Sequence, residues 1–95
     1  MARVNVSPEQ LRELSAAYQQ AADELRSRAS LLSTPTESLL LDWVGSASSA
    51  FQTLARDVDS SQYELISTLE KMARTLANAA QAFESADQNI SSAFQ

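Results

Sequence analysis

Cysteine and histidine are both missing from the 95 residues of this chain. Without them it can form no disulfide, no thiolate nucleophile and no Ser-His-Asp triad. The usual ligands of a zinc site are missing for the same reason. The sequence also holds no glycine-rich phosphate-binding loop. We therefore expect no metal site, no cofactor and no enzymatic activity.

Glycine and proline are rare, with one glycine and two prolines in the whole chain. Both residue types interrupt helices, so their scarcity leaves few places where a helix could end. Hydrophobic residues make up 44% of the chain, and the β-branched ones are too scattered to alternate along a strand. The composition predicts an all-α protein with long helices.

Positive charge is also in short supply, because seven Lys and Arg residues stand against twelve Asp and Glu residues, for a net charge of −5. Binding to nucleic-acid phosphates requires clustered Lys and Arg, so nucleic acid is not an expected partner. An acidic chain without a basic amphipathic face is not expected to insert stably into a membrane either.

Long apolar runs are absent as well. No stretch approaches the roughly 18 apolar residues of a membrane-spanning helix, and residues 1–8 lack the apolar core of a secretory signal peptide. If the protein leaves the cell, we expect it to use a route that does not read an N-terminal signal peptide.

A first helix is predicted from about residue 8 to residue 41. The Ser7 hydroxyl can accept from the Gln10 amide while the Gln10 side chain reaches back, and Pro8 suits the first helical position. The apolar residues that follow recur at heptad spacing and form a stripe suited to packing against other helices. The members expected in the bundle core are Leu11, Leu14, Tyr18, Leu25 and Leu32.

Pro35 falls inside this predicted helix. A proline in a helix interior deletes one backbone hydrogen bond and clashes with the preceding turn. The residues from Thr34 to Glu37 repeat the pattern of a capping box, so the chain could also stop near Ser33 and restart as a short helix. The sequence leaves a break and a kink at residues 34–35 as equal alternatives.

The only tryptophan and the only glycine, Trp43 and Gly45, lie two positions apart in residues 42–46, which we expect to form the elbow of a helical hairpin. Gly45 can adopt a positive φ, and Ser46 can cap the next helix. A second helix is predicted from about residue 47 to residue 86. Its expected core residues are Leu54, Val58, Leu65, Leu69, Met72 and Leu76.

The two predicted helices are long enough to lie antiparallel along most of their lengths. A chain this small buries little core by itself, and each hairpin leaves part of both apolar stripes in water. We therefore expect the hairpin to dimerise into a four-helix bundle. Charged residues lie mostly off the stripes, and Glu70 with Arg74 is an expected surface pair along one helix.

A chain of 95 residues with Trp43-Val44-Gly45 midway between two long helices resembles the WXG family of small type VII secretion proteins, the relatives of the early secreted antigenic target. The small residues 46–48 after the motif add to the resemblance, which covers the whole chain. It implies a substrate of a type VII (ESX-like) secretion system that is exported as a folded dimer. It also implies an FtsK-like secretion ATPase as a partner and a role as carrier for other proteins.

The resemblance further implies an export signal in the C-terminal tail, residues 83–95. In the family pattern an aromatic or apolar residue is followed four positions later by an acid and then by two more apolar positions. The matching residues are Phe83, Asp87, Ile90 and Phe94. Phe83 stands in the place of the tyrosine found in the narrower form of the pattern. Offsets of four, three and four return these side chains to one face of a helix.

Two functions from different classes remain. The first is a protein made in the cytoplasm and then secreted, which acts as an interaction module. The second is an intracellular helical adaptor or scaffold that is not secreted. The opening residues 6–11 resemble those of the self-pairing members, which favours a homodimer over a heterodimer with a related WXG-type chain. Secretion that depends on the ATPase would separate the two functions.

Overall fold

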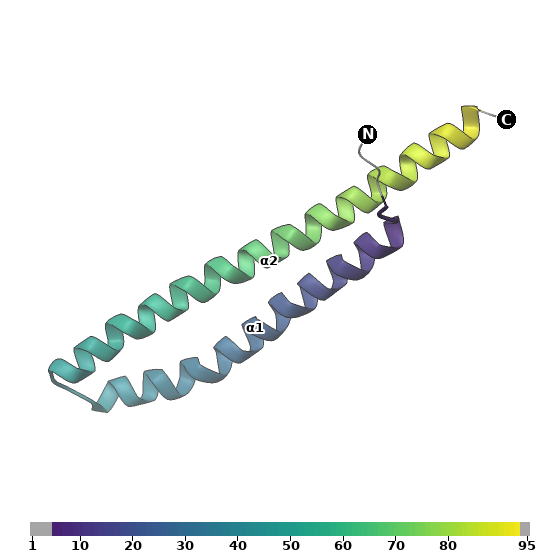
Figure 1. The fold of residues 1–95 in the computed structure, drawn as a ribbon. Coiled ribbons are helices and arrows are strands. Elements are labelled where there is room, and N and C mark those ends of the chain that lie inside the picture. The colour runs from purple at the N-terminus through teal and green to yellow at the C-terminus, as the bar shows by residue number, and fades with distance from the viewer. Residues whose placement is uncertain (1–4, 94–95) are drawn as a thin grey trace.

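The protein is a helical hairpin in a computed structural model that describes the backbone of residues 5–93 and the side chains of residues 5–86. Helix α1 spans Pro8–Asp42 and helix α2 spans Ser46–Ala93. The helices run antiparallel, so that the turn lies at one end and the start of α1 lies beside the later part of α2 (Figure 1). The all-α hairpin expected from composition and periodicity is confirmed.

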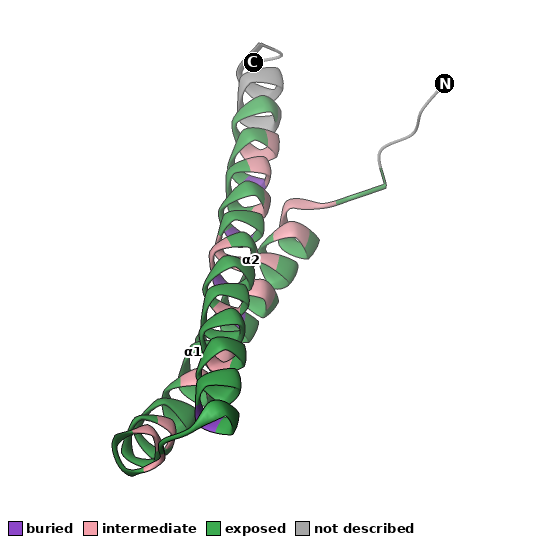
Figure 2. Ribbon diagram, turned by 90° about the vertical axis from the view of Figure 1, so that its left-hand side faces the viewer, coloured by how far each residue is buried: buried purple, intermediate pink, exposed green. Residues whose placement is uncertain are grey.

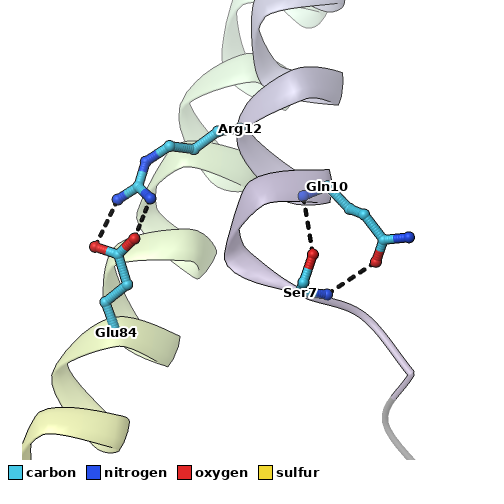
Figure 3. A network of polar contacts seen from close by, with 4 residues as sticks. All are labelled: Ser7, Gln10, Arg12 and Glu84. Carbon is cyan, nitrogen blue, oxygen red and sulfur yellow. Dashed lines mark hydrogen bonds and ion pairs between the residues drawn. The ribbon is translucent and has the colours of Figure 1, made fainter.

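The start of α1 is the capping box that the sequence predicts (Figure 3). The Gln10 amide donates to the Ser7 hydroxyl at 3.1 Å, and the Ser7 amide donates to Gln10 Oε1 at 2.9 Å. Pro8 follows at the first position of the helix, where its missing amide leaves no hydrogen bond unmade. The box therefore satisfies two amide groups that the helix would otherwise leave unpaired.

Pro35 lies within α1 without breaking it. The helix is continuous from Pro8 to Asp42, so the chain does not stop and restart at residues 34–35. Pro35 offers no amide to the Leu31 carbonyl, and a proline in a helix interior bends the helix. The axis of α1 changes direction in its last third (Figure 1).

Helix α2 is the longer arm and continues to Ala93, beyond its predicted end at about residue 86. A rise of about 1.5 Å per residue makes α2 roughly 72 Å long and α1 roughly 52 Å long. The end of α2 therefore projects past the start of α1 (Figure 1). The molecule is a rod with extents of 75 × 26 × 15 Å.

Small residues line the seam between the two arms. Ala22 of α1 and Ala73 and Ala80 of α2 are buried, together with Ile66, which is 7% exposed. The three α2 residues are spaced by seven and share one face of the helix. Alanines allow close approach of the helices but bury little apolar area. No large side chain in the described part of the chain is fully buried, and exposed residues predominate on both arms (Figure 2).

The predicted core residues lie beside this seam and are at least partly exposed in the single chain. Five of them are half-buried: Leu11, Tyr18, Leu25, Leu69 and Leu76. The other six have exposed fractions between 40 and 63%: Leu14, Leu32, Leu54, Val58, Leu65 and Met72. One hairpin alone thus leaves much of both apolar stripes in water.

A bidentate salt bridge joins the arms near the start of α1. Both guanidinium nitrogens of Arg12 donate to the Glu84 carboxylate, one of them at 2.7 Å (Figure 3). The hydrogen bond from Arg12 lowers the pKa of Glu84, and the same bond raises the pKa of Arg12. The two side chains are 49% and 43% exposed, so solvent screens the attraction between them.

Two further polar contacts connect the arms between this bridge and the middle of the hairpin. Arg26 of α1 donates to Glu70 of α2 at 3.2 Å. The sequence predicts that Glu70 pairs with Arg74 on its own helix, but in the structure its partner comes from the opposite arm. The Ser15 hydroxyl donates to the Ala73 carbonyl at 2.6 Å. Packing of the two helices, rather than spacing along one, selects these partners.

Candidate protein-interaction site

The turn between the helices contains both Trp43 and Gly45. Helix α1 ends at Asp42, and Trp43 follows in an extended conformation with φ −103° and ψ 121°. Gly45 has a φ of 125°, a value that residues with a side chain rarely adopt. A Cβ added at Gly45 would meet no atom within 4 Å. The backbone conformation, and not a lack of space, therefore accounts for a glycine at this position.

The start of α2 differs from the expected cap. Ser46, predicted as the capping residue, is the first residue of α2 itself. The Gly45 carbonyl accepts from the Ser49 amide at 3.1 Å, so Gly45 turns the chain and also precedes the helix as its cap. The hydroxyl that bonds to the turn is that of Ser48, which donates to the Trp43 carbonyl at 2.7 Å.

The Trp43 side chain packs on the first turns of α2. Its ring centroid lies 5.7 Å from that of Phe51, and the two ring planes are tilted by 45°; this separation is within the range of favourable aromatic pairs. Trp43 is half-buried, whereas its neighbours Leu41 and Val44 are 83% and 89% exposed. The turn and the end of α1 therefore present part of the indole and two apolar side chains at the surface.

An apolar groove runs between the arms beside the turn. Leu32 and Leu40 line it from α1, and Phe51, Leu54 and Val58 line it from α2. Three charged residues also line the groove: Glu37, Arg56 and Asp59. Because both helices contribute apolar residues to one groove, their two stripes meet on the same face of the hairpin at this end.

The exposed apolar residues continue from the groove along both helices. Leu65 and Met72 follow Val58 at intervals of seven, and Leu39 follows Leu32 at the same interval, so each set shares one side of its helix. We name these exposed stripe residues the apolar face. It consists of Leu14, Leu32, Leu39, Leu54, Val58, Leu65 and Met72.

The predicted export signal lies toward the end of α2 that is remote from the turn (Figure 1). Phe83 is half-buried there, next to Glu84, which pairs with α1. Asp87, Ile90 and Phe94 lie outside the residues whose side chains the structure describes. The structure therefore bears on Phe83 alone among the four predicted signal residues.

Five buried residues were not singled out as core or site residues from the sequence: Ala22, Ser48, Ile66, Ala73 and Ala80. Ile66 lies in the seam, and its spacing of seven from Ala73, repeated at Ala80, is a signal that could have identified it. Ser48 was recognised only as one of the small residues after the motif. No pattern in the sequence indicates that its hydroxyl bonds back to the carbonyl of Trp43.

Neither a metal site nor a membrane span is found in the described part of the chain. No three His, Cys, Asp or Glu side chains within it are grouped so that they could hold a metal ion. Over the same residues, neither helix has an apolar stretch of the length and hydropathy that crossing a membrane requires.

Comparisons with known proteins cover nearly the whole chain. A family described as WXG100, proteins of 100 residues with WXG, matches residues 3–88. The type VII secretion system extracellular protein A of Staphylococcus aureus strain USA300 is 29% identical over 94 residues, which are 99% of this chain and 97% of that protein.

Solved structures show the same hairpin. The secreted protein EsxB of Bacillus anthracis strain Sterne is 25% identical, with a TM-score of 0.79 over 90% of this chain and 99% of that one. EsxA of Geobacillus thermodenitrificans is 23% identical and also has a TM-score of 0.79, over 95% and 97% of the two chains. The second likeness concerns the fold alone.

Proposed function

Because this chain belongs to the WXG100 family, we propose that it is a small protein exported by a type VII secretion system, where it acts as an interaction module and carrier. The observation that carries the proposal is its similarity over 99% of its length to an extracellular protein of such a system. The hairpin shared with EsxB supports it. In this proposal the protein is made in the cytoplasm and is then exported by the type VII system.

The exported form is a dimer in which two apolar faces pack together as a four-helix bundle. The single chain exposes 7530 Å², whereas a compact protein of 10.3 kDa would expose about 5400 Å². The surface that the chain exposes beyond that of a compact protein is larger than the roughly 800 Å² that each partner buries in a standard interface. A second copy of the chain is the favoured partner, since one face can pair with itself around a two-fold axis. A related WXG-type chain is the alternative.

The FtsK-like secretion ATPase reads a surface built from two chains. In one hairpin, the turn between α1 and α2 lies at the opposite end from the later part of α2 (Figure 1), and Phe83 belongs to that later part. Antiparallel pairing of two hairpins would bring the turn of one chain to the same end as residues 83–95 of its partner. The tail contributes Asp87 together with the aromatic and apolar residues of the sequence pattern. It binds the ATPase with one face of a helix, as amphipathic helices bind in the groove of a partner.

Fractionation of cultures tests the export proposal. In cells with a functional secretion ATPase we expect the protein in the supernatant, and in cells without the ATPase we expect it to stay with the cell fraction. A cytoplasmic marker protein should remain in the cell fraction in both cases. A protein that stays inside in both strains contradicts export and favours the intracellular adaptor.

The tail is tested by Asp87→Ala. Removal of this acid should abolish secretion while circular dichroism and dimer mass stay unchanged. Asp57→Ala removes an exposed acid elsewhere on α2 and should be secreted normally. Trp43→Ala should also impair secretion, with some loss of stability. Normal secretion of both Asp87→Ala and a chain lacking residues 88–95 would rule out the composite signal.

A further inference from the structure

The backbone of Trp43 is tied to both helices. Its amide donates to the Leu39 carbonyl of α1 at 3.1 Å, and its carbonyl accepts from the Ser48 hydroxyl of α2 at 2.7 Å. Carbonyls at the end of a helix have no partner within the helix, so Ser48 satisfies a group that would otherwise need water. Ser48 is 7% exposed and is the one buried polar residue in the described part of the chain.

Ser48 and Phe51 both contact Trp43. They lie three positions apart on α2, a spacing that puts both on the same side of the helix. Ser48 bonds to the Trp43 backbone, and Phe51 contacts the Trp43 ring at a centroid distance of 5.7 Å. The two contacts define where the Trp43 backbone lies and which way its indole faces.

We propose that Ser48 is a positioning residue, whose hydroxyl holds Trp43 against Phe51 and so presents the indole in one orientation to the partner that reads the turn. A side chain that is ordered before binding loses less conformational freedom on association. The exposed Leu41 and Val44 beside Trp43 give that partner further apolar contacts. The role in recognition rests on the proposed function, because the partner is the secretion machinery.

The single tryptophan of the chain makes the positioning directly measurable. Loss of one ordinary hydrogen bond should lower about five-fold the ratio of molecules in which Trp43 is held against Phe51 to molecules in which it is not. In Ser48→Ala we therefore expect lower fluorescence anisotropy and stronger acrylamide quenching of Trp43, with circular dichroism and dimer mass unchanged. Ser48→Thr keeps the hydroxyl and should behave as the wild type.

Ser49→Ala is the matched control. It removes the neighbouring hydroxyl from an exposed position at the same level of α2, so helix propensity changes equally in the two variants. It should leave the fluorescence of Trp43 as in the wild type. Equal fluorescence changes in Ser48→Ala and Ser49→Ala would overturn the proposal.

A measurement on the wild-type protein covers the case in which Ser48→Ala fails to fold. The NMR order parameter of the Trp43 indole N–H should be close to the value of a rigid backbone, about 0.85, and a value below about 0.6 would overturn the proposal. This measurement requires no substitution and no secretion assay.

Secretion separates this inference from the proposed function. If the wild type is secreted, a folded and dimeric Ser48→Ala should be secreted several-fold less, whereas Ser49→Ala should not differ from the wild type. Normal secretion of Ser48→Ala despite a mobile tryptophan would overturn the role of this positioning in recognition and leave export intact. A wild type that is not secreted rejects the proposed function, and the fluorescence and NMR results then decide whether Ser48 orients Trp43.

Discussion

At the scale of single residues, the backbone of Gly45 is the most constrained feature of the turn. Its φ is 125°, and a Cβ would meet no neighbouring atom, so Gly45→Ala introduces backbone strain without a clash. We expect the free energy of unfolding to fall by about 1–3 kcal/mol in urea denaturation. Val44→Ala, at a position that is 89% exposed, should change it by less than about 0.5 kcal/mol. Equal effects would show that Gly45 does not hold a positive φ in solution.

The bridge between Arg12 and Glu84 makes stability depend on pH. The hydrogen bond from Arg12 lowers the pKa of Glu84 below its ordinary value of 4.5. A carboxylate whose pKa is lower in the folded chain than in the unfolded chain stabilises the fold at pH values above its pKa in the unfolded chain. This contribution is lost as the pH falls through its pKa in the folded chain. We expect Glu84→Gln to melt below the wild type at neutral pH and together with it in strong acid.

Salt provides the control for this prediction. Both side chains are partly exposed, so added salt at neutral pH should narrow the difference in melting temperature between Glu84→Gln and the wild type. A difference that stays the same in acid and in salt would assign the effect to packing of the Glu84 side chain and not to its charge.

At the scale of the elements, α1 continues through Pro35 despite a missing hydrogen bond. Pro35→Ala restores an amide donor for the Leu31 carbonyl. It also gives the unfolded chain more conformational freedom, which offsets part of this gain. We expect a net gain on the order of 1–2 kcal/mol in the free energy of unfolding. Ser38→Ala, at an exposed position of the same helix, should gain only about 0.5 kcal/mol or less. A clear loss of thermal stability in Pro35→Ala would show that the residue starts a separate helix in solution.

The packing of α2 on α1 depends most on Ile66. It is the largest side chain in the seam and is 7% exposed, so Ile66→Ala should lower the free energy of unfolding by about 2–5 kcal/mol. Tyr63→Ala, one turn away and 76% exposed, should have a small effect. The loss in Ile66→Ala should be present at every protein concentration, because the contact lies within one hairpin. A loss confined to high concentration would place Ile66 at a dimer contact.

At the scale of the whole molecule, a rod of 75 × 26 × 15 Å with an exposed apolar face gains stability by association. Sedimentation at micromolar concentration should give about twice the chain mass of 10.3 kDa, and the melting temperature should rise with concentration. Leu65→Ala, on the apolar face, should shift the mass toward the monomer, whereas Tyr63→Ala, outside that face, should not. A wild type that is a folded monomer under these conditions contradicts the dimer.

Features that depend on residues a few positions apart follow directly from the sequence. The capping box at Ser7 depends on side chains three positions apart, and the scarcity of glycine and proline leaves long helices as the available structure. The turn at Trp43 and Gly45 could be placed because the chain has one glycine, between two apolar periodic stretches. The hairpin and the candidate site at its turn were therefore predictable.

The way in which the two helices contact each other could not be read from the sequence and is seen in the tertiary structure. Leu65 and Ile66 are neighbours that point about 100° apart around α2, and both fit an apolar stripe. The rotation of α2 against α1 buries Ile66 and leaves Leu65 51% exposed. The same packing gives Glu70 a partner on the other arm, and the path of the turn brings the Ser48 hydroxyl to the Trp43 carbonyl. Periodicity identifies the apolar side of a helix. It does not specify which residues on that side contact the other helix, because this depends on contacts between residues far apart in the chain.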